Sequence, residues 1–309
     1  MNLRMLNSIF FTQRYIATKN HHMQFEKGAS IFIQVIAYSL ATLIALLTWN
    51  FLPEMEDLWR LAAADVAATV FIFLCSMIFN NSSMYDPYWS IKPAVIAAGY
   101  AFIFGLSSIA SIALFALMIL YNLRLTTNFF RDWGGLKHED WRYRNFRDQF
   151  PKAYWAVSFS GIHLFPTIMV YLACIPLYFG MKQSFEMSWL GWLGILITIA
   201  AVLIAYTADE QMRSFRSHPD NKGKNMNVGL WKHSRHPNYL GELLTWWGIY
   251  LVALDASSDY WWTGVGALAI TVMFVFISIP LMDNRSLKRR PNFEEHMKRT
   301  RAILPIPVN

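Results

Sequence analysis

Long apolar runs, each with few charges, recur along this sequence and restrict its fold more than any other feature. The hydrocarbon core of a bilayer is about 30 Å thick, and about 20 helical residues cross it. Six runs approach that length, at residues 29–52, 61–79, 156–179, 189–206, 239–254 and 261–281. Only 15% of the residues are charged, whereas soluble domains carry about 25%. The sequence therefore predicts an all-α, polytopic integral membrane protein, and its composition excludes a disordered or nucleic-acid-binding chain.

The stretch between residues 85 and 123 decides the number of spans. It can form one long helix after Pro93, giving seven spans, or two helices broken near residues 99–105, giving eight. Eight spans place 24 Lys and Arg residues on the cytoplasmic side and two outside, against 21 and six for seven spans. Because cytoplasmic loops collect Lys and Arg, we favour eight spans with both termini cytoplasmic, and seven spans remain the alternative. Eight spans put Asp86 and Lys92 at membrane depth, where ionisable groups are costly and usually functional.

The richest polar stretch, residues 209–242, begins at the end of a predicted span. Asp209, Arg213 and Arg216 are spaced four and three residues apart, so they share one helix face. This spacing is typical of a basic collar whose long side chains reach toward water. It is equally typical of a clamp for a polyanion, and the spacing leaves both interpretations open.

The sequence SRHPNYLGE at residues 234–242 opens the next span. Proline is favoured in the first turn of a helix, so His236-Pro237 predicts a helix start, and the free N–H groups of that turn attract anions. The residues expected around a phosphate held there are Arg235, His236, Asn238 and Tyr239, and Glu242 lies about one turn deeper. The alternative is a helix cap with a buried hydrogen bond.

Four stretches together resemble the DUF1295 branch of the steroid 5-alpha-reductase C-terminal superfamily. They are SRHPNYLGELLTWWG at 234–248, YDPYWSIKP at 85–93, RLTTNFFRDWGGLKHEDWRY at 124–143, and the C-terminal RR…RTRAILPIP. The resemblance implies a steroid 5-alpha-reductase-like bundle of seven or eight transmembrane helices that binds NADPH from the cytoplasmic side. It also implies hydride transfer to a carbon–carbon double bond conjugated to a ketone in a lipophilic, steroid-like or isoprenoid substrate. The expected organisation is a cytoplasmic segment at 1–28, accessory helices at 29–80 and a catalytic membrane domain at 81–309.

The resemblance also implies roles for individual residues. In the reductases an Asp and two Arg residues bind the cofactor with the spacing of Asp209, Arg213 and Arg216, and an Asn-x-x-Gly-Glu contact matches Asn238 to Glu242. The expected cofactor-binding set is therefore Arg124, Asp209, Arg213, Arg216, Arg235, His236, Asn238, Tyr239 and Glu242.

The same resemblance implies two catalytic residues, Asp86 and Tyr121. In the reductases a Tyr three residues before an Arg, and a Glu seven residues before a Pro, polarise the substrate carbonyl. Tyr121 precedes Arg124 at that spacing, and Asp86 stands where the reductases have Glu, one methylene shorter. Donors aimed at the carbonyl oxygen stabilise the enolate that forms on hydride delivery.

The HEDWRY stretch at 138–143 has no assigned chemistry, although its two acids could pair with nearby arginines. Those arginines, Arg142, Arg144 and Arg147, fit either ordinary positive-inside bias or phosphate binding. No metal site is expected, because two cysteines cannot build a structural zinc site and the histidines lack zincin spacing.

Two other functions compete with the reductase. An S-adenosylmethionine-dependent methyltransferase of a lipid or prenyl-cysteine shares the RHPxY motif, but its cationic cofactor needs carboxylates rather than the cations that NADPH needs. A non-catalytic membrane protein would leave the ionisable residues within spans without a purpose. We expect a lipophilic substrate and membrane lipid as partners and no nucleic acid, and the oligomeric state is open. A bacterial inner membrane is the expected location, with the endoplasmic reticulum as the alternative.

Overall fold

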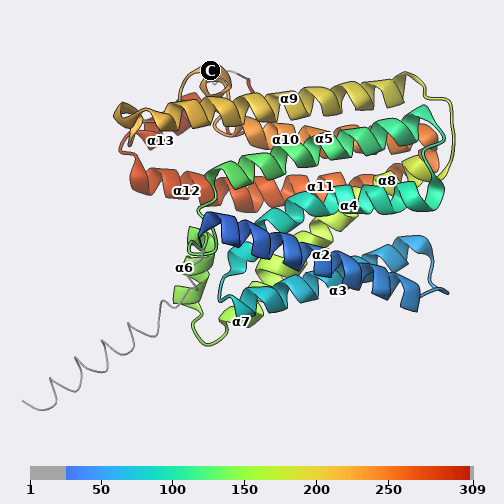
Figure 1. The fold of residues 1–309 in the computed structure, drawn as a ribbon. Coiled ribbons are helices and arrows are strands. Elements are labelled where there is room, and N and C mark those ends of the chain that lie inside the picture. The colour runs from blue at the N-terminus through green and yellow to red at the C-terminus, as the bar shows by residue number, and fades with distance from the viewer. Residues whose placement is uncertain (1–25, 307–309) are drawn as a thin grey trace, which may run out of the picture. The chain divides into compact units, whose positions relative to one another are not determined.

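The computed structural model describes residues 26–306, and every regular element among them is a helix (Figure 1). The α-helices are α2 (Lys27–Phe51), α3 (Asp57–Ile78), α4 (Asp86–Phe104), α5 (Ile109–Asp132), α6 (Trp141–Gln149), α7 (Tyr154–Val157), α8 (Phe165–Lys182), α9 (Trp189–Ser217), α10 (Pro237–Ala256), α11 (Val265–Met273), α12 (Ile279–Arg289) and α13 (Phe293–Arg299). π-Helical turns occur at Ser158–Leu164 and Phe274–Ser278, and 3₁₀ turns at Ser82–Met84, Pro219–Asn221, Gly229–Lys232 and Ser258–Gly264. Most of the predicted cytoplasmic segment 1–28 lies outside the described residues.

Six helical segments are long and apolar enough to cross a membrane, judged by length and composition. They are Lys27–Phe51, Asp57–Ile78, Ile109–Asp132, Tyr154–Lys182, Trp189–Ser217 and Ser258–Arg289. The prediction of an all-α, polytopic membrane protein is therefore confirmed. Two further long helices, α4 and α10, coincide with predicted spans, and a total of seven or eight crossings stays a prediction.

The ambiguous stretch 85–123 forms two helices rather than one, because α4 ends at Phe104 and α5 begins at Ile109. Gly105 between them has a φ of +76°, a left-handed conformation that glycine adopts without steric cost. Ser108 and Ser111 then exchange hydrogen bonds, each hydroxyl accepting from the other residue's backbone N–H at 3.1 Å. This reciprocal arrangement satisfies two of the free donors at the start of α5. The break therefore has a local chemical cause in Gly105 and the serines.

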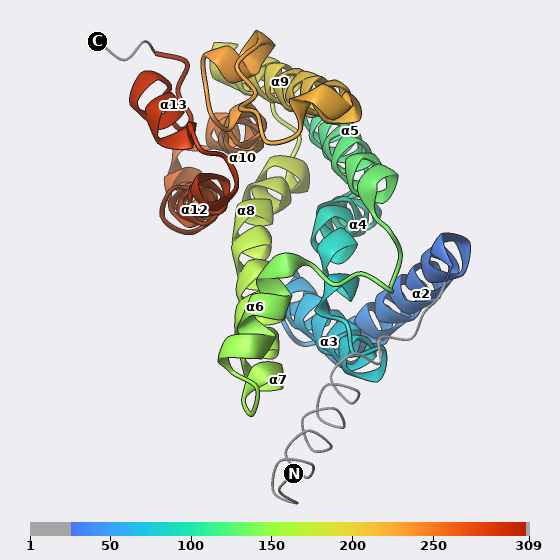
Figure 2. The same cartoon turned by 90° about the vertical axis from the view of Figure 1, so that its left-hand side faces the viewer.

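The described residues form two compact units, each held together by its own internal contacts. The boundaries between the units fall within α4 and α8. The first unit holds the described residues up to Tyr88 together with Asp132–Thr167, and the second holds Trp89–Arg131 and the residues from Ile168 onward. In the first unit α2 packs along α3 (Figure 2). Arg60 fixes the turn between them, because its Nε donates to the Trp49 carbonyl at 2.6 Å and its guanidinium lies 4.0 Å above the Trp49 ring.

In the second unit α5, α9 and α10 run side by side (Figures 1 and 2). Glycines let α9 and α10 approach closely, as is common where helices pack within a membrane. A Cβ added at Gly241 would lie 2.6 Å from the Ala201 carbonyl oxygen. One added at Gly248 would lie 2.2 Å from Thr198 Oγ1 and 2.7 Å from the Gly194 carbonyl oxygen. This close approach brings the polar side chains at one end of α9 and α10 within bonding distance.

Gly248→Ala is expected to lower the free energy of unfolding by about 1–3 kcal/mol, because the added methyl group overpacks the helix interface. Gly161→Ala is the matched control, since a Cβ there meets no atom within 4 Å. Its effect should stay within about 1 kcal/mol and can be stabilising, because alanine favours helix more than glycine does. Unfolding of both variants in detergent measures the difference, and equal losses would contradict the packing described.

Candidate active site

A cluster of buried charges joins α5, α9 and α10. Arg124 donates from Nη2 to Asp209 Oδ2 at 2.6 Å and from Nη1 to Glu242 Oε1. Tyr121 donates its phenol hydrogen to Glu242 Oε2 at 2.7 Å, and Asn238 Nδ2 donates to Asp209 Oδ1 at 3.2 Å. These five residues form what we name the Arg124 cluster. In it one cation holds two carboxylates, and a phenol is held against one of them.

Helix periodicity explains how the sequence builds the Arg124 cluster. Tyr121 and Arg124 are three residues apart on α5, and Asn238 and Glu242 are four apart on α10, so each pair shares a helix face. Asp209 comes from α9. The structure thus brings together four residues of the expected cofactor-binding set and adds Tyr121, which was expected to be catalytic.

The Arg124 cluster is shielded from solvent, and one of its donors lacks an acceptor. The side chain of Arg124 is 7% exposed, and burying such a charge is costly unless it is paired. Its two terminal nitrogens are paired, yet its buried Nε has no hydrogen-bond partner among the described residues. The ring of Trp246 packs edge-on against Tyr121 with 5.5 Å between centroids. The Nε–H of Arg124 is therefore a buried donor that the described residues leave unsatisfied.

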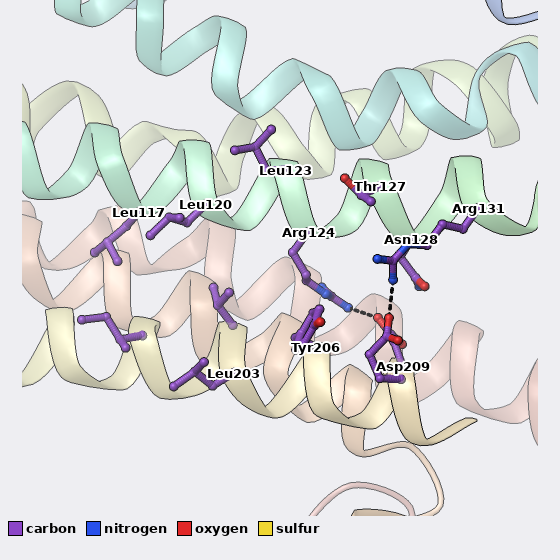
Figure 3. A pocket seen from close by; sticks show the side chains of 13 residues that line it. Leu117, Leu120, Leu123, Arg124, Thr127, Asn128, Arg131, Leu203, Tyr206 and Asp209 are labelled. Atoms are coloured by element: carbon purple, nitrogen blue, oxygen red, sulfur yellow. Dashed lines mark hydrogen bonds and ion pairs between the residues drawn. The ribbon is translucent and has the colours of Figure 1, made fainter. Parts of the chain in front are cut away.

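A cavity of ≈ 400 Å³ lies between α5 and α9 and reaches the Arg124 cluster (Figure 3). Its polar lining consists of Arg124, Thr127, Asn128, Arg131, Tyr206, Asp209 and Glu210. Leucine, isoleucine and valine side chains line the rest, among them Leu117, Leu120 and Leu203. In Figure 3 the side chain of Arg124 extends from α5 toward Asp209 on α9. The cavity therefore combines a polar end with apolar walls, as ligand sites commonly do.

The other cations of the predicted clamp lie further along α9. Arg213 donates from Nη2 to Asn128 Oδ1 at 2.6 Å, and its Nε lies 3.5 Å from Glu210 Oε1. Arg216 lines a second cavity, of ≈ 340 Å³, with further basic side chains on its wall, including those of Lys222, Lys224 and Arg290. The prediction that Asp209, Arg213 and Arg216 lie on one helix is confirmed.

Arg235, His236 and Tyr239 form a different cluster at the start of α10. Arg235 Nη2 donates to Asp283 Oδ2 at 2.7 Å, and His236 Nε2 lies 2.9 Å from Asp283 Oδ1. The backbone N–H groups of both residues donate to carbonyl groups at 301 and 302. Tyr239 stacks on the His236 ring, with 5.1 Å between centroids. The structure thus engages Arg235 and His236 with α12 and the C-terminal segment rather than with the Arg124 cluster, and it stacks Tyr239 on His236.

Asp86 lies in the first unit, buried at the start of α4. Its Oδ1 accepts a hydrogen bond from the Tyr143 phenol, and Arg142 Nη2 lies 3.8 Å away. Burial, reinforced by the charge of Asp86, raises the pKa of Tyr143, so this phenol keeps its proton. Sequence reasoning gave Tyr143 no role, and the only available signal was its place in HEDWRY. Asp86 and Tyr121 each pair with a partner in their own unit, and their catalytic roles stay predictions.

The HEDWRY stretch holds the segment before α4 in place. Glu139 is buried, and its Oε1 accepts hydrogen bonds from the Ser82 backbone N–H at 2.9 Å and from Arg147 Nη2 at 3.0 Å. Asp140 accepts from Arg142 Nε at 2.7 Å. The expected pairing of the two acids with nearby arginines is therefore confirmed. No group of three or more His, Cys, Asp or Glu residues is placed to hold a metal ion within residues 26–306.

The protein is a polytopic helical membrane protein, because six of its helical segments are able to cross a membrane. It has an internal polar site, because a buried charged cluster lies where three helices meet. Comparison with protein families then identifies the family of the chain. The chain belongs to the DUF1295 family, whose model is described as "Protein of unknown function (DUF1295)" and matches residues 72–300. The predicted membership is confirmed, and the matched range contains the whole Arg124 cluster and Asp86.

One relative comes from the fission yeast Schizosaccharomyces pombe and is described as "Uncharacterized protein C594.04c". It is 28% identical over 255 residues, which cover 73% of this chain and 73% of the relative. No solved structure matches this chain.

Proposed function

We propose that this protein is an NADPH-dependent membrane oxidoreductase that reduces a carbon–carbon double bond conjugated to a ketone in a lipophilic, steroid-like or isoprenoid substrate. The Arg124 cluster carries the proposal, because it buries a phenol, an arginine and two carboxylates where α5, α9 and α10 meet. Hydrogen-bond donors fixed in a water-excluded site suit a reaction in which negative charge develops on an oxygen.

The donors present fit a dinucleotide with phosphate and carboxamide groups. Arg213 and Arg216 lie on α9 beyond Asp209, and Arg216 shares its cavity with further cations. These cations would hold phosphates, since charge-assisted bonds to phosphate are strong. Asn238 would bond the neutral polar groups of the dinucleotide. NADPH bound there would supply the hydride.

The residues of the Arg124 cluster would stabilise the charge that the reaction creates. Hydride addition to the β-carbon of an enone leaves negative charge on the ketone oxygen. Tyr121 has one hydrogen on its Oη, which bonds Glu242 in this structure, and this hydrogen would turn to the ketone oxygen when the substrate binds. Arg124 holds Glu242 in place, and Glu242 in turn orients the phenol. Asp86, in the first unit, stays a proposed catalytic residue.

The methyltransferase alternative fits the Arg124 cluster less well. S-adenosylmethionine is a cation and needs a carboxylate to balance its charge, whereas Asp209 and Glu242 are both engaged by Arg124. The reductase assignment places the cofactor side and the C-terminus in the cytoplasm. We propose a bacterial inner membrane as the location, with the endoplasmic reticulum as the alternative.

The proposal is tested by incubating the purified protein with a panel of lipophilic enones, once with NADPH and once with S-adenosylmethionine. The reductase assignment expects a product that has gained two hydrogen atoms across the double bond, formed in step with NADPH oxidation. Transfer of a methyl group to a lipid or thiol acceptor, without any NADPH oxidation, would support the methyltransferase instead.

Arg216→Ala and Glu242→Gln are each expected to weaken NADPH binding about tenfold or more, a loss of about 1.4 kcal/mol. Arg216→Ala removes a cation that is expected to hold a phosphate of NADPH. Glu242→Gln removes the negative charge that fixes Arg124 and the polar groups around it. Arg299→Ala is the control, because Arg299 is an exposed cation of α13 paired with Glu295. Calorimetric measurement of NADPH affinity decides, and unchanged affinity in both variants would contradict the cofactor assignment.

A further inference from the structure

The cavity between α5 and α9 is an elongated groove. Its lining runs from Leu117 to Arg131 on α5 and from Ile199 to Glu210 on α9. At 1.5 Å of rise per residue these stretches are about 20 Å and about 16 Å long. The lining residues recur every three or four positions, so one face of each helix borders the groove along its length. A ligand that fills the groove is therefore extended along the helix axes.

The apolar part of the groove opens to the surroundings of the two helices. Leu120 on α5 and Leu203 on α9 line the groove and are 53% and 59% exposed. Both helices belong to segments that are apolar enough to cross a membrane, so exposed leucines on them face hydrocarbon. A lipid can thus reach the groove sideways, without passing through water.

The other half of the groove, from Arg124 to Arg131 on α5, is polar, and Arg124 has an unsatisfied donor. Arg124 pairs with Asp209, and Arg131 pairs with Glu210, both across the groove from α5 to α9 (Figure 3). The Nε of Arg124 is buried, in a side chain that is more than nine-tenths buried, and has no hydrogen-bond partner among the described residues. A ligand oxygen that reached the Arg124 Nε–H would be the acceptor that this donor lacks. A hydrocarbon ligand without a polar group would leave the Nε–H unsatisfied.

We infer that the groove binds a single-chain lipid whose hydrocarbon chain lies along the apolar half between α5 and α9 and whose carbonyl oxygen lies at Arg124. This inference rests on the proposed function, and it identifies the substrate class as a linear alkyl or isoprenoid enone rather than a fused-ring steroid. An extended chain fits the apolar half of the groove, which follows α5 from Leu117 to Leu123 over about 9 Å. The carbonyl end of the lipid meets the part of the groove lining that carries charged groups.

Photolabelling tests the inference without requiring turnover. The probe is a long-chain alkyl enone with a diazirine in its chain, added to the purified full chain in nanodiscs without NADPH. Mass spectrometry is expected to find the label on groove residues of α5 and α9, around Leu120 and Leu203. An unlabelled linear enone should compete at least tenfold better than a steroid enone. Label spread evenly over the exposed leucines of the spans, or equal competition by the steroid, would overturn the inference.

Tryptophan substitutions provide matched controls. Leu203→Trp and Leu120→Trp fill the groove from opposite walls and should reduce labelling at least fivefold. Leu196→Trp and Ile112→Trp lie on the same helices at similarly exposed positions outside the lining and should leave labelling unchanged. Because all four positions are largely exposed, the variants should fold, which unfolding curves verify. Groove labelling in a protein that bound no NADPH would support the groove and contradict the proposed reductase.

Discussion

Phenylalanine in place of Tyr121 is expected to lower the turnover of an enone substrate about 10²–10³-fold, the usual effect of losing one donor to a developing oxyanion. The substitution removes the phenol hydrogen that now bonds Glu242 and leaves the ring against Trp246. The cations expected to hold the cofactor phosphates are untouched. NADPH affinity should therefore change less than about twofold, which is under 0.5 kcal/mol.

Steady-state kinetics and NADPH binding, measured on the same preparation, separate these two effects. Tyr100→Phe is the matched control, because Tyr100 is another fully buried tyrosine of the second unit and lies outside the Arg124 cluster. It should keep nearly full turnover. If Tyr121→Phe turned over as fast as the wild type, Tyr121 could not be the donor to the carbonyl oxygen.

Arg124→Gln should destabilise the protein by about 3–5 kcal/mol, because it leaves two buried carboxylates without their cation. Arg131→Gln provides the control on the same helix, two turns further along. Arg131 also bridges α5 to α9, through Glu210, but its side chain is 44% exposed. Exposed ion pairs contribute only about 0–1 kcal/mol.

Unfolding of both variants in the same detergent measures this difference. A loss several times larger for Arg124 than for Arg131 is the expected result. Comparable losses would mean that the Arg124 cluster is solvated, and that its charges are not held in the dry environment that the proposed chemistry needs.

Local patterns in the sequence predicted the helices and part of the site. The apolar runs located the long helices, and His236-Pro237 marked the start of α10. The spacing of Asp209, Arg213 and Arg216 placed these residues on one helix, and α9 does extend to Ser217. Such features depend on residues within a few turns of each other, which helix periodicity reveals directly.

Partners from distant segments could not be predicted in this way. Arg235 and His236 bind Asp283, more than forty residues later, which had no signal of its own. The acid that Tyr121 contacts is Glu242 on α10, and the phenol that Asp86 contacts is Tyr143 on α6. Sequence patterns mark Asp86, Tyr121 and Glu242 as candidates, but helix packing decides which tyrosine meets which acid.

Calorimetric titration of the purified wild-type protein with NADPH and, separately, with S-adenosylmethionine is the most direct test of the assignment to a phosphate-bearing hydride donor. We expect saturable binding of one NADPH per chain, weakened by salt because arginines hold the phosphates, with no binding of S-adenosylmethionine. Saturable binding of S-adenosylmethionine together with no binding of NADPH at any salt concentration would contradict it.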